Sequence, residues 1–191
     1  MNAALLRKGK RSAIFMQKGT PMNRLYQSRF LGQYTLRRLS RDDMPLLLSF
    51  MACHGDFCAM GGGNGDAANI QADMEALPPG KQPADKHYCG FFRNEELMAL
   101  LDLVEGYPTP DIAYIGLFMV GKAYCRCGMG TALMKELFSL LGNAGFRCVR
   151  LGVLRENIPG RGFWNKLGFL PVSEKKAEGR TVDVMEKILS L

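Results

Sequence analysis

The chain has 191 residues, of which 47% are hydrophobic and 23% are charged, a composition that fits a globular domain and excludes global disorder. Its formal net charge of +7 is unevenly distributed, because residues 1–41 hold ten Lys and Arg and no Asp or Glu. The remaining 15 basic and 18 acidic residues leave a net charge of −3 on residues 42–191. The positive balance therefore describes a basic N-terminal arm, which we place at residues 1–33 and expect to be partly disordered, and nucleic-acid binding by the body is not expected.

Targeting signals and cysteine usage point to a cytoplasmic protein. The longest apolar run, residues 112–120, is too short to cross a bilayer, and the N-terminus lacks the sustained apolar segment of a secretory signal. The acid-free start is typical of a solvated extension, and a mitochondrial transit peptide has a similar composition. The six cysteines lack paired CxxC spacing, so we expect reduced thiols and predict neither a disulfide framework nor a metal site.

Residues 34–191 show the periodicity of a folded domain. In chain order we predict a strand over 34–39, helices over 41–51 and 67–77, strands over 87–92, 96–104 and 112–120, a helix over 128–141, a strand over 148–154, a helix over 158–167, and strands over 170–173 and 181–189. Ser40 is a typical N-cap for the first helix. The run at 112–120 is apolar on both faces, as in a buried central strand. This order predicts a mixed α/β domain with a central sheet and helices on both faces.

The turn after the predicted central strand has the features of an anion site. The strand leads into a turn that contains Gly128 and Gly130, and a helix begins there. Unpaired N–H groups at a helix N-terminus attract anions, and glycines let the backbone approach a ligand closely. Lys122 and Arg126 add positive charge nearby. The same glycines would also serve a tight connection between a strand and a helix.

A second informative stretch follows the strand at 148–154. Asn157 leads into a short helix that contains the aromatic pair Phe163-Trp164 and ends in Leu167-Gly168-Phe169. In this order, the two stretches resemble those of the GNAT superfamily of acyl-CoA N-acyltransferases. The resemblance covers roughly residues 34–189 in element order and is strongest over 112–169. It implies the β-α-α-β-β-β-α-β-α-β-β fold of that superfamily.

The resemblance implies acetyl-CoA as the acyl donor and no metal. The pyrophosphate loop of the family falls on residues 125–130, where Cys125 replaces the usual Gln or Arg. The cofactor-binding residues that the resemblance implies are Met119, Val120, Cys125, Arg126, Cys127, Gly128, Met129, Gly130, Thr131, Asn157 and Trp164. Trp164 stands where many relatives carry a Tyr that protonates the leaving thiolate, and an indole cannot do this. Tyr107, Tyr114 or a water could take that role, or no acid is needed.

The implied reaction is transfer of an acetyl group to a primary amine by direct attack in a ternary complex. A carboxylate would take the proton of the amine, and the candidates are Asp102 and Glu105, with Asp111 behind them. Tyr114 occupies the position at which some relatives carry a catalytic Glu. Asp102 is the first choice because an acid inside an apolar run needs a partner or a purpose.

The acceptor is expected to be a small molecule or a peptide amine. The glycine-rich loop at 59–68 is a candidate lid, and the nearby acids Asp56, Asp66 and Asp73 would favour a cationic acceptor. No membrane partner is expected, and a homodimer is left open. The alternative to an enzyme is a catalytically silent GNAT-like module that binds CoA as a sensor, which Trp164 permits. Nucleic-acid binding through residues 1–41 would be a minor addition.

Overall fold

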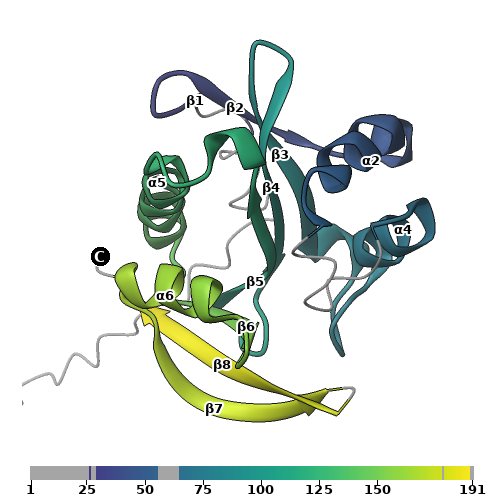
Figure 1. The fold of residues 1–191 in the computed structure, drawn as a ribbon. Helices are drawn as coiled ribbons and strands as arrows, with labels where there is room; N and C mark the ends of the chain where they lie inside the picture. Colours follow the sequence, from purple (N-terminus) through teal and green to yellow (C-terminus); the bar gives the residue numbers. More distant parts are fainter. Residues whose placement is uncertain (1–25, 27–28, 56–64, 178, 190–191) are drawn as a thin grey trace, which may run out of the picture.

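The computed structural model describes residues 26, 29–55, 65–177 and 179–189. In chain order the elements are β1 (Arg29–Phe30), β2 (Tyr34–Arg38), α2 (Met44–Ala52), α4 (Ala67–Glu75), β3 (Lys86–Arg93), β4 (Glu96–Glu105), β5 (Ile112–Val120), α5 (Met129–Asn143), β6 (Cys148–Leu154), α6 (Ile158–Lys166), β7 (Leu170–Ala177) and β8 (Arg180–Ile188). They form a single mixed sheet with helices on both faces (Figure 1). The predicted mixed α/β fold is confirmed.

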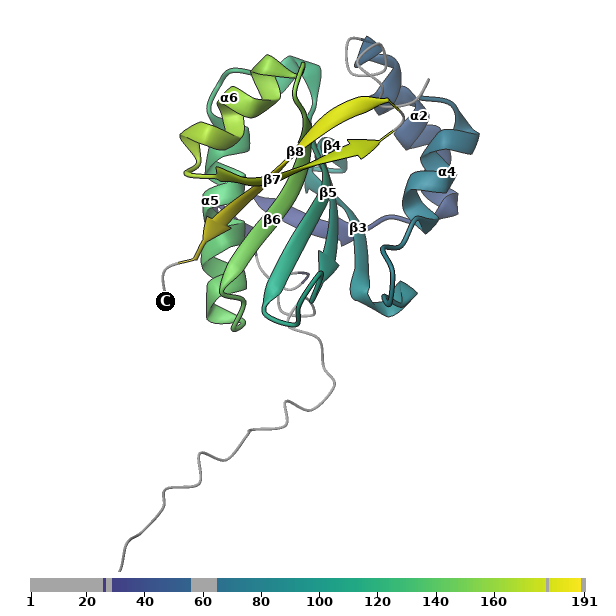
Figure 2. The ribbon, with the colours of Figure 1, turned by 90° about the horizontal axis from the view of Figure 1, so that it is seen from below.

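The sheet has eight strands in the order β1-β2-β3-β4-β5-β6-β8-β7. Every neighbouring pair is antiparallel except β5 and β6, which are parallel and are connected through α5. Helices α5 and α6 cover one face of the sheet, and α2 and α4 cover the other (Figures 1 and 2). The parallel pair therefore lies inside the sheet, and both of its strands have neighbours on their outer sides.

Each face of the sheet carries its own hydrophobic core. On the α5 face, Leu133, Leu137 and Leu141 are fully buried, and their spacing of four residues is the one that predicts an amphipathic helix. On the other face, Leu47 from α2 and Ile70 from α4 pack into a separate cluster. The sheet thus divides the interior into an α5/α6 side and an α2/α4 side.

The structure adds one strand before the predicted start of the domain. β1 pairs with β2, and Phe30 is fully buried, with its ring edge-on to Phe91 at a centroid distance of 4.9 Å. The sheet therefore begins within the segment assigned to the arm, because a strand of two residues shows no alternation that could predict it. The arm prediction for residues 1–25 and 27–28 lies outside the described residues.

The closing strand β7 is longer than predicted, since it runs to Ala177 and not to Ser173. All of its side chains are exposed, as expected of an edge strand, so no apolar pattern marks its second half. No helix in the described ranges is long and apolar enough to cross a membrane. The cysteines at 53, 89, 125, 127 and 148 are free thiols, and Cys58 lies outside the described residues.

Candidate functional site

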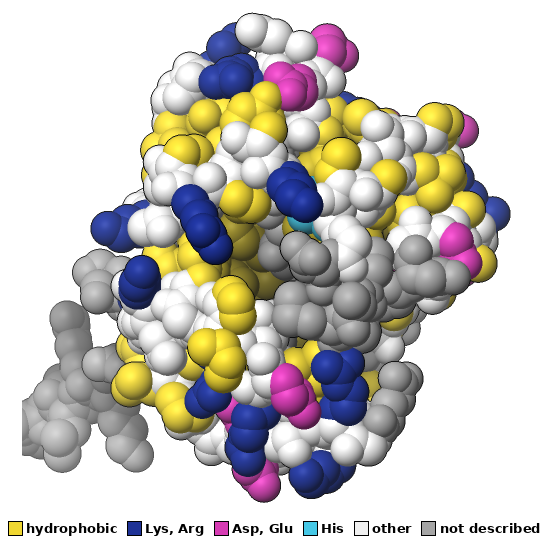
Figure 3. Space-filling view, viewed as in Figure 1, with side chains coloured by type: hydrophobic (Ala, Val, Ile, Leu, Met, Phe, Trp, Pro, Cys, Tyr) yellow, Lys and Arg dark blue, Asp and Glu magenta, His cyan; other side chains and the backbone are white. Residues whose placement is uncertain are grey.

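The two parallel strands separate partway along their length. β5 and β6 pair only up to Ile115 and Leu151, although the strands continue to Val120 and Leu154. We call the diverging ends, residues 116–120 and 152–154, the wedge. In Figure 3 a hollow with hydrophobic walls opens between the positions that α5 and α6 occupy in the same view of Figure 1. A wedge in a sheet leaves backbone groups that a ligand can pair with.

The backbone of β5 directs specific groups into the wedge. The Gly121 N–H donates to the Met98 carbonyl at 2.8 Å, and in an antiparallel ladder the residues that face the partner strand alternate with residues that face away. Phe118 and Val120 therefore direct their N–H and C=O groups toward the wedge. Met119 directs its backbone toward β4 and buries its side chain on the α2/α4 side. Val120 thus lies where the resemblance predicts, whereas Phe118, and not Met119, is its backbone partner there.

The loop before α5 presents a row of N–H groups. Arg126 and Gly128 have φ of 62° and 85°, so the chain turns twice through the left-handed region before the helix begins. The first recorded helical bond runs from Ala132 N–H to the Gly128 carbonyl, at 3.0 Å. Within the described residues, no hydrogen bond is recorded for the N–H groups of residues 126–131. Together with the α5 dipole, they form a site suited to a phosphate group.

The side chains of this loop leave the N–H groups accessible. Cys127 directs its thiol back to the Tyr124 carbonyl, with Sγ 3.0 Å from the oxygen. The Cys125 thiol lies 3.6 Å from the Val120 and Gly121 carbonyl oxygens. Arg126 is exposed and Thr131 is half-buried. The cation that the family carries at position 125 is therefore absent, and the charge in this loop comes from the neighbouring Arg126.

The first turn of α5 packs directly on the end of β5. A Cβ atom on Gly130 would lie 2.9 Å from Val120 Cγ2 and 3.5 Å from Phe118 Cε1. Met129 is buried in the same cluster. The absence of a side chain at residue 130 therefore lets the N–H groups of α5 approach the wedge-facing backbone of β5. The anion site and the wedge are two parts of one continuous site.

Asp102 lies at the narrow end of the wedge, on the α2/α4 side. It is 8% exposed, and its Oδ2 accepts a hydrogen bond from Lys86 Nζ at 2.9 Å. A Cβ atom on Gly116 would lie 2.5 Å from the same Oδ2, so a side chain at this position of β5 would displace the carboxylate. Asp102 Oδ1 is buried and has no recorded hydrogen-bond partner within the described residues. Burial raises the pKa of this carboxyl above its usual value, and the Lys86 ammonium opposes that effect.

Tyr114 lies on the same face of the sheet as Asp102, toward β6. Its ring packs edge-on against Tyr107 with a centroid distance of 5.5 Å. Its hydroxyl lies 3.2 Å from the position of a Cβ atom on Gly152, the first residue of β6 beyond the paired segment. Burial raises the pKa of Tyr114, so the phenol keeps its proton. A carboxylate and a phenol therefore flank the two glycines, Gly116 and Gly152, at which the strands separate.

Glu105 and Asp111 are not brought to the wedge. Glu105 follows Asp102 by three residues on β4 and so faces the α5 side of the sheet. It is buried there, and its Oε1 lies 2.9 Å from His87 Nε2. Asp111 accepts a hydrogen bond from Thr109 Oγ1 and forms an ion pair with Arg147, at the far end of β5. Of the carboxylates predicted as bases, the structure places only Asp102 beside the wedge.

Asn157 and Trp164 have structural roles. The Asn157 side chain accepts a hydrogen bond from the Gly160 N–H at 2.9 Å and so caps α6. Trp164 is 8% exposed, and its ring centroid lies 4.9 Å from Phe163 and 5.2 Å from Phe169. The indole is thus part of the core on the α5/α6 side. Its ring centroid also lies 6.1 Å from that of Phe118 in the wedge, and the cofactor contact that the resemblance predicts for it stays a prediction.

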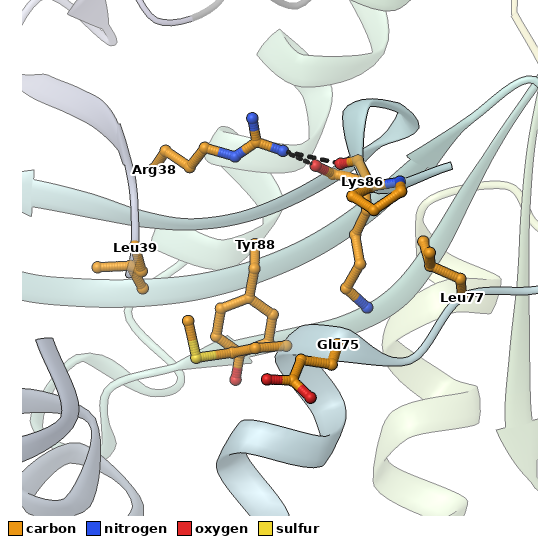
Figure 4. A pocket seen from close by; sticks show the side chains of 8 residues that line it. Arg38, Leu39, Glu75, Leu77, Lys86 and Tyr88 are labelled. Carbon is orange, nitrogen blue, oxygen red and sulfur yellow. Dashed lines mark hydrogen bonds between the residues drawn. The ribbon is translucent and has the colours of Figure 1, made fainter. Parts of the chain in front are cut away.

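A pocket of about 240 Å³ opens on the α2/α4 side, one strand beyond Asp102. It is lined by Arg38, Leu39, Met74, Glu75, Leu77, Pro83, Lys86 and Tyr88. In Figure 4 the Lys86 and Glu75 side chains both extend toward the space beside the Tyr88 ring. Lys86 also donates to the Ala76 carbonyl at 2.8 Å and to Asp102. The pocket and the wedge therefore share one buried ammonium group.

The predicted lid and its acids are only partly described. Asp56 and residues 59–64 of the loop lie outside the described residues. Asp66 caps α4 by accepting a hydrogen bond from the Asn69 N–H at 2.8 Å. Desolvation raises the pKa of Asp73, and Lys86 opposes this shift. Within the described ranges, no three His, Cys, Asp or Glu side chains gather as a metal site would require.

Comparisons with known proteins agree with this arrangement. Residues 65–169 match the acetyltransferase (GNAT) family. An acetyltransferase from Thermus thermophilus is similar in structure, with a TM-score of 0.66 and 21% identity over 82% of this chain and 97% of that chain. The ribosomal-protein-S18-alanine N-acetyltransferase from Escherichia coli has a TM-score of 0.59 and 18% identity over 83% of this chain and 95% of that chain. Ard1 from Thermoplasma volcanium has a TM-score of 0.60 and 18% identity, with coverage of 83% and 99%. At such identities the structural matches establish the fold alone, and no curated protein sequence matches the chain.

Proposed function

The chain belongs to the GNAT acetyltransferase family, and we propose that it transfers an acetyl group from acetyl-CoA to a primary amine by direct attack in a ternary complex. The observation that carries the proposal is the point of strand separation, where Asp102 and Tyr114 flank Gly116 and Gly152. A base and an acid beside a backbone wedge are what an acyl transfer between a thioester and an amine requires.

The residues of the site fit the donor in two places. The N–H groups of residues 126–131 would hold the pyrophosphate, because they are unpaired and lie at the positive end of the α5 dipole. The wedge-facing groups of Phe118 and Val120 would pair with the amide groups of the pantetheine arm. The thioester supplies the activated acetyl group, and the neighbouring backbone N–H groups would polarise its carbonyl.

Proton transfer is assigned to Asp102 and Tyr114. A free primary amine has a pKa near ~10 and must lose a proton before it can attack. Asp102 accepts that proton, and the neutral amine then forms the C–N bond as the C–S bond breaks. The nitrogen loses its second proton to the Tyr114 oxygen, which restores the phenol after it has protonated the thiolate. Tyr114, which keeps its proton because burial raises its pKa, donates to the departing thiolate. Lys86 holds Asp102 in place and keeps part of its negative charge compensated.

The acceptor is proposed to approach from the α2/α4 side, where the pocket shares Lys86 with Asp102. Its apolar walls and volume of about 240 Å³ suit a group of side-chain size. Both a small amine and a peptide amine fit this description. The Escherichia coli neighbour is named for a protein alanine acceptor, which makes a peptide one class to include in a substrate panel.

A second candidate function is a silent module that binds acetyl-CoA as a sensor. Trp164 favours it, because an indole stands in the usual position of the acid and cannot protonate a thiolate. The sensor needs the loop at 126–131 and the wedge-facing backbone of β5. It does not need Asp102 to be a base.

Binding and turnover together test both candidates. We expect acetyl-CoA to bind the full chain with a Kd between about 1 μM and 1 mM, the usual range for enzyme substrates. Titration calorimetry measures this binding, and release of free CoA thiol with a panel of amines and N-terminal peptides measures turnover. Binding without thiol release for any acceptor favours the sensor. Absence of binding at millimolar acetyl-CoA contradicts both candidates.

Replacing Tyr114 by Phe is expected to lower kcat roughly 100-fold and to leave the Kd for acetyl-CoA unchanged. The phenol is the assigned acid, and the ring itself is kept. Steady-state kinetics with thioesters of more acidic thiols should show a smaller loss, because those thiolates leave without a proton.

The matched control is Tyr107→Phe. It removes the hydroxyl from the ring that packs on Tyr114 and leaves the assigned acid in place. An equal loss of kcat for every leaving group in Tyr114→Phe would contradict the assignment.

A further inference from the structure

His54 joins the end of α2 to the cofactor side of β5. It follows the last turn of the helix, and its ring stacks on Phe50 with a centroid distance of 4.8 Å. Its Nδ1 lies 2.8 Å from the Phe50 carbonyl oxygen, and its Nε2 lies 2.9 Å from the Val120 carbonyl oxygen. Val120 is one of the two residues whose backbone faces the wedge. One imidazole thus spans α2 and the strand end proposed to receive the donor.

Both partners of the ring are carbonyl oxygens, which accept hydrogen bonds and cannot donate them. A neutral imidazole carries a single N–H, so it satisfies one of these oxygens and directs a lone pair at the other. Both bonds exist together only when both ring nitrogens carry protons. The Phe50 carbonyl belongs to the last turn of α2, where the negative end of the helix dipole favours a positive charge.

The groups recorded beside the ring in the described residues are a thiol, a phenyl ring and carbonyl oxygens. The Cys125 thiol lies 3.6 Å from the same Val120 oxygen and is the titratable neighbour recorded from the loop before α5. From α2 the ring meets Phe50, through its ring and its carbonyl. No carboxylate in the described part of the chain is recorded in contact with the imidazole.

We propose that His54 is a positioning residue for acetyl-CoA, through the contact of its Nε2 with the Val120 carbonyl oxygen. The ring fixes the orientation of the Val120 peptide, so that its N–H remains directed into the wedge. It also ties that peptide to α2, the helix that covers the acceptor side. This inference rests on the proposed function, because the wedge matters only if the donor binds there. It predicts that cofactor affinity, and not the chemical step, depends on the His54 side chain.

The test measures acetyl-CoA affinity and turnover in His54→Ala and His54→Gln. We expect the Kd for acetyl-CoA to rise about tenfold in His54→Ala, as for loss of a hydrogen bond to a charged group, while kcat changes less than twofold. Glutamine can donate one bond, so His54→Gln should lose less affinity. The control is Cys53→Ser, because the contact recorded for that thiol in the described residues is with the Ser49 carbonyl of α2. Its Kd for acetyl-CoA should match that of the wild type.

Affinity and thermal stability together separate positioning from general stabilisation. If His54 only stabilised the fold, both variants would melt at a lower temperature and keep the wild-type Kd for acetyl-CoA. ¹⁵N NMR reports the charge state of His54 directly, because His87 is the only other histidine and His54→Gln assigns the signals. Thermal melts of both variants show whether the fold is kept.

Two outcomes would overturn the inference. Equal affinity of wild type and both variants at every pH would show that His54 does not position the wedge. Tighter binding in His54→Ala would show that the ring competes with the donor for the Val120 carbonyl. If the wild type itself does not bind acetyl-CoA, the proposed function fails first, and that result is distinguishable from either of these.

Discussion

Replacing Asp102 by Asn is expected to lower kcat/KM for the amine by roughly 10²- to 10⁴-fold, the usual contribution of a general base. The amide has nearly the same size as the carboxyl group, so it fits below Gly116, where no larger group could. It cannot accept a proton from the amine. The Kd for acetyl-CoA should stay within about twofold of the wild type, because Asp102 lies on the α2/α4 side and the anion site is at the start of α5. Steady-state kinetics and calorimetry measure the two quantities separately.

The pH profile gives a second measure of the same group. Burial raises the pKa of Asp102 above its usual value of 3.8, with Lys86 opposing the shift. A base works only when it is deprotonated, so kcat/KM should fall as the pH decreases through this raised pKa. The residual activity of Asp102→Asn should lack that acidic limb. A profile that keeps the limb in the variant would assign the base to another residue.

Glu105→Gln is the matched control, since it alters the other buried acid of β4. Glu105 faces the α5 side and lies beside His87, so its removal should leave the acidic limb in place. Removing one partner of a buried pair also costs stability, so melting temperatures of both variants are needed. Loss of turnover in Glu105→Gln together with normal turnover in Asp102→Asn would invert the assignment.

The two strands of the wedge are predicted from the sequence with the bounds that the structure shows. Apolar residues dominate both strands, Ile112–Val120 and Cys148–Leu154, as is typical of buried parallel strands. The glycine turn before α5 is also predicted from the sequence, because the need for glycine in a tight turn depends only on the residues next to it. Features that depend on one segment and its immediate neighbours in the chain can therefore be predicted from the sequence.

The chemistry of the site depends on which strands are neighbours, and the sequence leaves this undetermined. Nothing about Lys86, at the start of a strand, predicts that its ammonium meets Asp102. Gly116 and Gly152 interrupt strands, which signals a close approach, but only the pairing shows that both follow the point of separation. The sequence does predict that Asp102 and Glu105 face opposite sides of the sheet, because side chains three residues apart on a strand point to opposite faces. That alternation would have removed Glu105 as a candidate base.

Replacing Gly130 by Val is expected to raise the Kd for acetyl-CoA by at least about 100-fold, close to 3 kcal/mol of binding free energy. A Cβ atom at residue 130 would lie 2.9 Å from Val120 Cγ2 and 3.5 Å from Phe163 Cε2. Either the start of α5 moves away from β5 or the end of β5 shifts into the wedge. The first displaces the N–H groups proposed for the pyrophosphate, and the second displaces the backbone proposed for the pantetheine arm. Titration calorimetry with acetyl-CoA measures the loss.

Gly162→Val controls for the cost of placing a branched side chain in a helix. It adds the same group to α6, where nothing lies within 4 Å of the new Cβ atom, so acetyl-CoA affinity should be kept. Titration with CoA fragments then locates the damage in Gly130→Val. Loss of affinity for adenosine 3′-phosphate 5′-diphosphate, the nucleotide portion of CoA, implicates the start of α5, and loss confined to the pantetheine portion implicates β5. A Kd for acetyl-CoA within threefold of the wild type would mean that the donor does not use the junction of α5 and β5, and both assignments at this junction would then fail.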